Sequence, residues 1–151
     1  MIDRENRQKV IEHARHYVSG LIENDELDEL MFNEIKTEDI GLKKVMEQLW
    51  HCYDDLTTHK NEGKYKLSKS TRKDIARYIL FLQSDTEYQW PRHLLKQPFL
   101  RLLSYAVTLG ILPYIVDRKF RSSGPIEIWP FFTEYEYKQC LENPKYFKKN
   151  T

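Results

Sequence analysis

The sequence has few cysteines, few glycines and no long apolar run, and each scarcity excludes a class of protein. Its 151 residues include two cysteines, too few for the disulfide framework of a small secreted domain. The five glycines are scattered, so the chain has no glycine-rich phosphate loop. The longest apolar stretches, such as 78–82, are far too short to cross a bilayer, and the N-terminus lacks the apolar core of a secretory signal. These absences predict a soluble, cytoplasmic protein with no membrane partner.

Motifs that carry known chemistry are missing as well. No HExxH, GxSxG or paired CxxC pattern occurs. His13 and His16 stand three apart, where both imidazoles could reach one metal, but nothing nearby supplies the further ligands that a site needs. Adjacent His51 and Cys52 would point about 100° apart on a helix, a poor geometry for a nucleophile and its base. We therefore expect no cofactor, no metal and no assignable catalytic residue, which leans against an enzyme while leaving one of unrecognised type open.

What the chain does contain is typical of one globular domain. Hydrophobic residues make up 40% of it and charged residues 31%, a balance too apolar for a disordered chain. A chain of this length can bury a sizeable core without disulfides. We therefore predict a single domain over residues 1–151.

Apolar residues recur at helical spacing through most of the sequence. The pattern predicts helices over about 3–22, from 24 or 25, from 37 or 39 to about 58, from 68–71 to 82, over 98–110 and from 133 to just before 144. Asp3 can cap the first helix, and Thr133 with Glu136 forms a capping box at the last. Two β-rich pieces, 114–116 and 126–129, are compatible with a small β-hairpin. The fold class is therefore mainly α, a compact bundle of about six helices with an optional hairpin near residues 114–129.

The charges are unevenly distributed. Residues 1–58 carry 14 acidic and 7 basic side chains, a net charge of −7, whereas residues 59–151 carry 9 and 17, a net charge of +8. Such asymmetry can mark a partner surface. The alternative is that the two halves attract each other.

Acidic residues are concentrated between Glu23 and Asp39, where eight carboxylates accompany one lysine. Exposure of Leu30, Met31 or Phe32 among them would give an apolar anchor with an acidic rim, which would steer a basic protein partner. A solvated helix face is the alternative. The loop SDTEYQWP adds polar and aromatic contact points, although its aromatics could simply cover the core. The candidate partner-binding residues are Glu23, Asp25, Glu26, Asp28, Glu29, Asp85, Glu87, Tyr88 and Trp90.

The basic half supports a second hypothesis. Six cations surround the predicted loop before the fourth helix: Lys60, Lys64, Lys66, Lys69, Arg72 and Lys73. Three more flank Phe120, namely Arg118, Lys119 and Arg121. Basic side chains with interleaved aromatics can hold a phosphate backbone and stack bases. This pattern favours a nucleic-acid-binding or regulatory domain, but a solvated lysine-rich loop gives the same sequence.

Two segments resemble known proteins. ILFLQSDTEYQWP, residues 79–91, and GPIEIWPFFTEYEY, residues 124–137, are similar to segments of small uncharacterised bacterial proteins, some of which look like immunity partners of secreted toxins. The likeness covers under a fifth of the chain and carries no catalytic residue across. It implies a bacterial protein that binds another protein. The leading hypothesis is therefore a non-enzymatic, protein-binding role of the immunity type, in which a basic toxin domain is blocked; the oligomeric state stays open.

Overall fold

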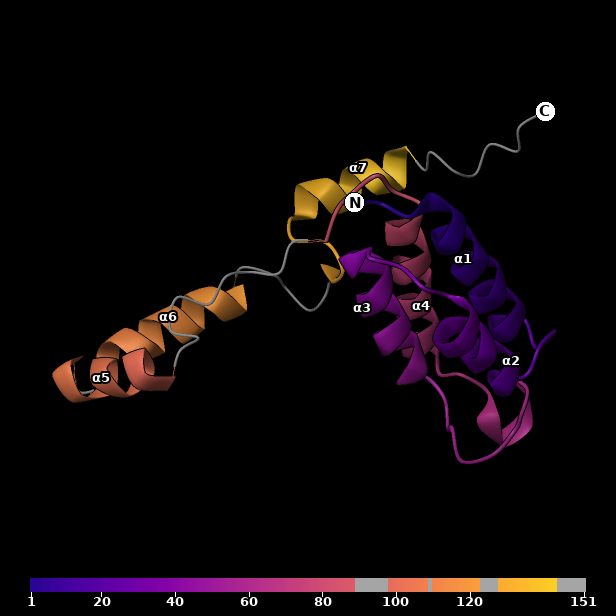
Figure 1. Ribbon diagram of the computed structural model, residues 1–151, viewed down its shortest axis with the longest axis horizontal. Helices are drawn as coiled ribbons and strands as arrows, with labels where there is room; N and C mark the ends of the chain where they lie inside the picture. Colours follow the sequence, from indigo (N-terminus) through magenta and orange to yellow (C-terminus); the bar gives the residue numbers. More distant parts are fainter. Residues whose placement is uncertain (89–97, 109, 123–127, 144–151) are drawn as a thin grey trace. The chain divides into compact units, whose positions relative to one another are not determined.

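The protein is all-helical in the residues that its computed structural model describes, which are 1–88, 98–108, 110–122 and 128–143. The predicted mainly α fold is confirmed (Figure 1). The described residues contain no strand, and none of their helices has the length and apolar character to cross a membrane. The α-helices are α1 (Arg4–Val18), α2 (Asn24–Asp28), α3 (Ile40–Trp50), α4 (Lys69–Leu82), α5 (Pro98–Thr108), α6 (Ile111–Ser122) and α7 (Glu134–Glu142).

The chain divides into two compact units. Unit 1 comprises residues 1–88 and 138–151, and unit 2 comprises residues 89–137. In unit 1, α1, α3 and α4 pack against one another, and α2 with a π-helical turn, Glu29–Glu34, packs on α1 (Figure 1). In unit 2, α5 and α6 form an antiparallel helical hairpin.

Short polar side chains start the long helices of unit 1, as their sequences predict. Asp3, Asp39 and Ser68 each accept a hydrogen bond from the backbone amide three residues on, at 3.1, 3.2 and 3.0 Å. Each bond satisfies an amide that has no partner within the helix. These three residues therefore fix where α1, α3 and α4 begin.

Two helices end earlier than their apolar patterns predict. α1 ends at Val18 instead of residue 22, because the Ser19 hydroxyl donates to the Arg15 carbonyl and Gly20 takes a positive φ of 73°. α3 ends at Trp50 instead of residue 58. Beyond it, the Asp54 carboxylate accepts from the Leu56 amide at 3.0 Å, a local bond that competes with helix.

The core of unit 1 combines one apolar stripe from each long helix. Side chains at spacings of three and four on each helix meet between α1, α3 and α4 and are shielded from water. The main ones are Val10, Ile11, Ala14, Tyr17, Leu42, Val45, Leu49, Ile75, Phe81 and Leu82.

A buried ion pair ties these helices together at one end. The Arg7 guanidinium is only 1% exposed and donates to both carboxylate oxygens of Asp39, at 2.6 and 3.1 Å. It also donates to the carbonyls of Ser84 and Thr86, which follow α4. Gly41 lies against this group, since a Cβ there would come within 3.1 Å of Arg7 Nη2. Arg7 thus joins α1 to the start of α3 and the end of α4.

The optional β-hairpin is not formed, because its first piece belongs to α6. Residues 114–116 lie inside Ile111–Ser122, whose start is fixed by the Thr108 hydroxyl accepting from the Leu112 amide at 3.2 Å. This cap, with helical apolar spacing, overrides the strand propensity of Tyr114, Ile115 and Val116. Of the second piece, residues 126 and 127 lie outside the described residues.

The last helix begins where its capping signal predicts. The Thr133 hydroxyl accepts from the Glu136 amide at 3.1 Å, and the Glu136 carboxylate accepts from the Phe132 amide at 3.3 Å. The Tyr137 ring lies against Phe131, with centroids 5.3 Å apart. α7 ends at Glu142, before Pro144.

Candidate functional site

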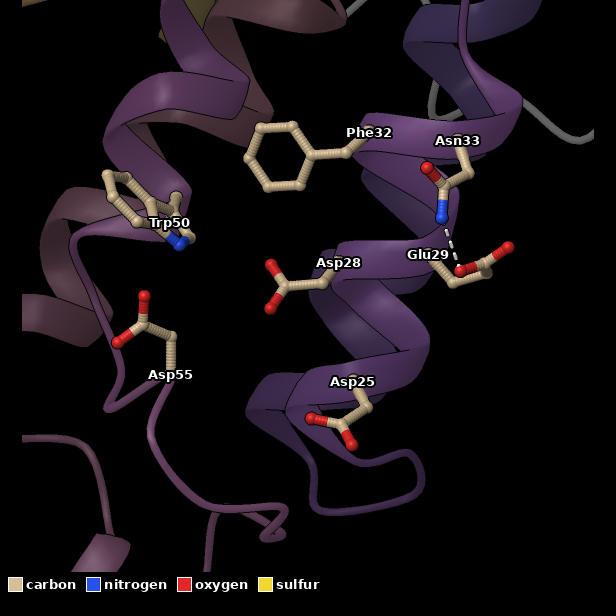
Figure 2. Close-up of a pocket in the computed structure, with 7 residues that line it drawn as sticks. All are labelled: Asp25, Asp28, Glu29, Phe32, Asn33, Trp50 and Asp55. Carbon is tan, nitrogen blue, oxygen red and sulfur yellow. Dashed lines mark hydrogen bonds between the residues drawn. The ribbon is translucent and has the colours of Figure 1, made fainter.

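An acidic cleft lies between α2 with its π-helical turn and the C-terminal end of α3 (Figure 2). Its volume is about 520 Å³. We call it the acidic cleft, and its lining residues are Asp25, Asp28, Glu29, Phe32, Asn33, Trp50 and Asp55.

Two exposed aromatic side chains form its apolar part. Phe32 is 57% exposed and Trp50 is 38% exposed, and their rings meet edge to face with centroids 6.4 Å apart. The π-helical turn explains the outward position of Phe32, because Leu30 and Met31 of the same turn are buried in the core. Of the three anchors that the sequence offered, the structure therefore exposes Phe32.

Four carboxylates line the cleft together with this aromatic pair, and neutral groups hold three of them in place. Asp28 accepts from the Tyr53 hydroxyl at 2.5 Å, Asp25 from the Thr58 hydroxyl, and Glu29 from the Asn33 amide at 2.5 Å. Figure 2 shows Asp28 and Asp55 pointing into the space beside Trp50. In the described part of the chain, no lysine or arginine forms an ion pair with any of the four.

The crowding of like charges makes the cleft favourable for a cation. Burial raises the pKa of the Asp28 carboxyl, and the charges of Asp25 and Asp55 raise it further against the lowering effect of the Tyr53 hydrogen bond. The pKa of Tyr53 is raised above its ordinary range, chiefly by burial, so this hydroxyl remains a donor at neutral pH. A positive group in the cleft would relieve the repulsion between the carboxylates.

The chemistry of the lining suits an organic cation. Among the described residues, no group of three or more histidine, cysteine, aspartate or glutamate side chains is placed to hold a metal ion. A guanidinium or ammonium group, by contrast, gains from both the aromatic faces and the carboxylates. The lining therefore has the chemistry that accepts a guanidinium or ammonium group.

Three of the predicted partner-binding residues line this cleft: Asp25, Asp28 and Glu29. The neighbouring acidic pair has a structural task instead. Glu26 accepts from the Glu23 amide at 3.1 Å, which completes the capping box of α2. Part of the acidity of this segment thus starts a helix.

The three described candidates of the loop after α4, Asp85, Glu87 and Tyr88, do not line the cleft. Asp85 accepts from Arg4 at 3.0 Å, and the Glu87 carboxylate is 3.0 Å from the amino group of Met1. Tyr88 is buried and meets Phe81 edge to face. Asp85 and Glu87 therefore lie beside the N-terminal end of α1. Trp90 is outside the described residues.

Trp50 and Asp55 are functional candidates that the sequence analysis missed. Trp50 stands outside the apolar stripe of Leu42, Val45 and Leu49 on α3. A large aromatic residue off the buried stripe of a helix must face solvent or a partner, and this signal could have identified it. Asp55 carried no such signal, because it lies in a stretch that the pattern assigned to helix.

The six cations around the loop before α4, which we call the basic segment, are all exposed. All six of its cations lie on the loop before α4 or on its first turns, and each is solvent-accessible: Lys60, Lys64, Lys66, Lys69, Arg72 and Lys73. Of the second basic group, Arg118 is exposed on α6, and the side chains of 119–121 lie outside the described residues. The first group thus presents six cations to solvent.

Cys52, His13 and His16, which could in principle act as a nucleophile or bind a metal, make ordinary structural contacts. Burial raises the pKa of Cys52 to about 11, and its thiol donates to the Gln48 carbonyl at 3.2 Å, so it is protonated at neutral pH. His13 is bonded to the Lys9 carbonyl at 3.0 Å, and its ring centroid is 6.3 Å from that of His16. Neither arrangement is that of an activated nucleophile or a metal site.

No family model matches this chain, and no curated protein or solved structure matches it either.

Proposed function

We propose that this chain is a non-enzymatic, protein-binding protein of the immunity type, which receives a basic surface of a bacterial toxin domain in its acidic cleft. The observation that carries the proposal is the combination in that cleft of two exposed aromatic rings with four carboxylates that no described cation neutralises. The resemblance of residues 79–91 and 124–137 to small bacterial proteins supports the immunity role. The proposal places the protein in the bacterial cytoplasm.

The physical basis is electrostatic steering followed by anchoring. Carboxylates around a cleft attract a basic partner over a Debye length of about 8 Å at physiological salt and raise the association rate. An arginine that then stacks on Trp50 would share its charge with Asp28 and Asp55 (Figure 2). Aromatic residues at such positions carry a large share of binding energy in interfaces.

The test begins with recovery of the tagged protein from its native cells at moderate salt, with identification of what co-purifies. We expect one stoichiometric basic protein, whose toxic activity is lost in the complex. The cleft variant Asp28→Asn/Asp55→Asn should weaken that complex by about a hundredfold or more, because coupling energies of close charge pairs are about 1.5–7 kcal/mol. Both substitutions keep side-chain shape, and the Asp28→Asn side chain retains an amide oxygen that can accept from the Tyr53 hydroxyl.

A matched control changes the same amount of charge elsewhere. Glu5 and Glu38 are exposed carboxylates outside the cleft, with side chains 81% and 93% exposed. The variant Glu5→Gln/Glu38→Gln should therefore bind nearly as tightly as the wild type. A partner that binds the cleft variant and the wild type equally well would overturn the proposed site.

The basic segment supports a second candidate function, nucleic-acid binding, because its six cations are all exposed. It predicts a complex with DNA or RNA at low salt whose affinity falls steeply as salt increases. Lys64→Gln/Lys66→Gln/Lys69→Gln should weaken it, whereas the cleft variant should leave it unchanged. Absence of a mobility shift with single-stranded and duplex probes at low salt would contradict this function.

A further inference from the structure

The carboxylates of the acidic cleft keep acceptor oxygens for a ligand. In Asp25, Asp28 and Glu29, one oxygen accepts from a neutral neighbour, and the other accepts no hydrogen bond from the described residues. Neither oxygen of Asp55 accepts one from those residues. A ligand that carries several N–H donors therefore finds several acceptors here. The carboxylates alone, however, attract a lysine ammonium as well as an arginine guanidinium.

The aromatic pair of the cleft is what distinguishes the two cations. The ring planes of Phe32 and Trp50 lie 86° apart, so the rings form two nearly perpendicular walls. A flat cation that stacks on Trp50 therefore turns its edge toward the ring of Phe32. Aromatic faces attract positive charge, and the edge of a guanidinium is a row of N–H donors. Both ring contacts thus suit the planar head of an arginine.

The carboxylates beside Trp50 favour the same head group. Asp28 and Asp55 point into the space next to the indole ring (Figure 2). A guanidinium that lies flat on the ring keeps its N–H donors in the plane, where it can donate to carboxylates at the same time as it stacks. One cation therefore makes two kinds of contact without giving up either.

A lysine ammonium uses this lining less well. It is compact and strongly hydrated, whereas a guanidinium is more weakly hydrated and carries five donors in one plane. Asp25, Glu29 and Asp55 are exposed, so an ammonium beside them keeps much of its water and gains little from each charge pair. It has no flat surface to place on Trp50. The charge attracts both cations, but the rings add more to the binding of arginine.

We propose that the acidic cleft selects an arginine side chain over a lysine side chain, and that Trp50 determines this choice. The proposal rests on the proposed function, because it names the side chain that a basic protein partner places in the cleft. Tryptophan is the aromatic residue on which cations bind best. Trp50 is 38% exposed and is the last residue of α3, so its ring is accessible at the end of a rigid helix.

The test uses two blocked five-residue peptides of glycine and serine that differ only at the central residue, arginine or lysine. Each is titrated into the full chain at low salt, and binding is measured by NMR from the amide signals of Asp28 and Asp55. We expect the arginine peptide to bind about tenfold more tightly than the lysine peptide. In the wild type, the indole N–H signal of Trp50 should shift with the arginine peptide.

The variant Trp50→Leu identifies the determinant. It should reduce the preference for arginine to about twofold, because it removes the flat ring and keeps all four carboxylates. Tyr114→Leu is the matched control, since Tyr114 is a 62% exposed aromatic residue of α6 that does not line the cleft. This control should keep the preference of the wild type, and circular dichroism should show the same helix content in both variants.

Each contrary result has a distinct meaning. A lysine peptide that binds as tightly as the arginine peptide, or no shift with either at millimolar concentration, would overturn the selection of arginine. The proposed function would survive that result if the co-purified partner still needed Asp28 and Asp55. An unchanged preference in Trp50→Leu would overturn the role of Trp50. Free arginine that binds more tightly than the peptide would assign the cleft to a small guanidinium compound and overturn the protein side chain as its occupant. The comparison of the two peptides on the wild type needs no variant, so a Trp50→Leu chain that fails to fold leaves the test intact.

Discussion

Replacement of Asp39 by alanine should be among the most damaging single changes in this protein. Its carboxylate accepts four hydrogen bonds: from Arg7 Nε at 2.6 Å, Arg7 Nη2 at 3.1 Å, the Asp3 amide at 3.0 Å and the Leu42 amide at 3.2 Å. Alanine removes all four acceptors at once. The Arg7 guanidinium, 1% exposed, would keep its charge without a counterion.

The expected cost follows from two of these losses. Removing one partner of a buried ion pair costs about 3–5 kcal/mol, and removing an N-cap costs about 1 kcal/mol. The free energy of unfolding should therefore fall by about 4–6 kcal/mol, which is a large part of the ~5–15 kcal/mol that stabilises a typical domain.

Urea denaturation monitored by far-UV circular dichroism measures this cost, and a double-mutant cycle identifies its origin. The cycle uses Asp39→Ser, which retains a capping hydroxyl, together with Arg7→Met, which retains apolar bulk without charge. The double variant should be less destabilised than the sum of the singles, by about 2 kcal/mol, because it leaves no unpaired charge.

Two results would refute this account of the ion pair. One is a loss below ~1 kcal/mol in Asp39→Ala, which is what exposed ion pairs give. The other is strict additivity in the cycle, which would mean that the two side chains act independently. Either result would remove Arg7 from its role as the tie between α1, α3 and α4.

Three further predictions concern pH, close packing and the cleft. Burial alone would raise the pKa of Asp39, but its bonds from Arg7 and two amides hold that pKa below the ordinary value. The stability that this lowered pKa contributes is complete above about pH 4 and is lost as the pH falls through the folded-state pKa. The urea midpoint should therefore fall in acid. Gly41→Ala should destabilise by about 1–3 kcal/mol despite the better helix propensity of alanine, because the new Cβ would lie 2.9 Å from the buried Phe81 ring; a higher melting temperature would contradict this. Asp28→Asn should stabilise the free protein by about a few tenths of a kcal/mol at neutral pH. The raised pKa of Asp28 means that its negative charge is disfavoured in the native state, and screening by solvent keeps the gain small. Reduced stability would show instead that the charge is favourable in the native state.

The helix starts could be predicted because their causes are local. Asp3, Asp39, Ser68 and Thr133 each bond an amide three residues away, so a short polar residue before an apolar stripe is enough to identify them. The helix ends and the optional hairpin were harder. The apolar spacing of α3 continues past Trp50, yet the helix ends there, and the Asp54 side chain beyond it bonds the Leu56 amide in competition with a helix.

The cleft could be predicted only in part. The acidic residues of α2 and the candidate anchor Phe32 follow from composition and helical spacing. Trp50 and Asp55 join them through the packing of α3 against the core, which no local pattern records. The capping role of Glu23 and Glu26 is local, whereas long-range contacts place Asp85 and Glu87 beside the N-terminal end of α1.

The helical class, the capping residues and the acidic character of the first half follow from the amino-acid sequence alone, because each depends on neighbours within a few positions. Which charged groups are buried and which aromatic rings face solvent depends on how the helices pack. Arg7 shows the reason: as one basic residue among 24 it does not stand out in the sequence, and its burial depends on Asp39 and Ser84, which lie 32 and 77 residues away. Long-range contacts of this kind depend on the packing of whole helices, and no window along the chain contains both partners.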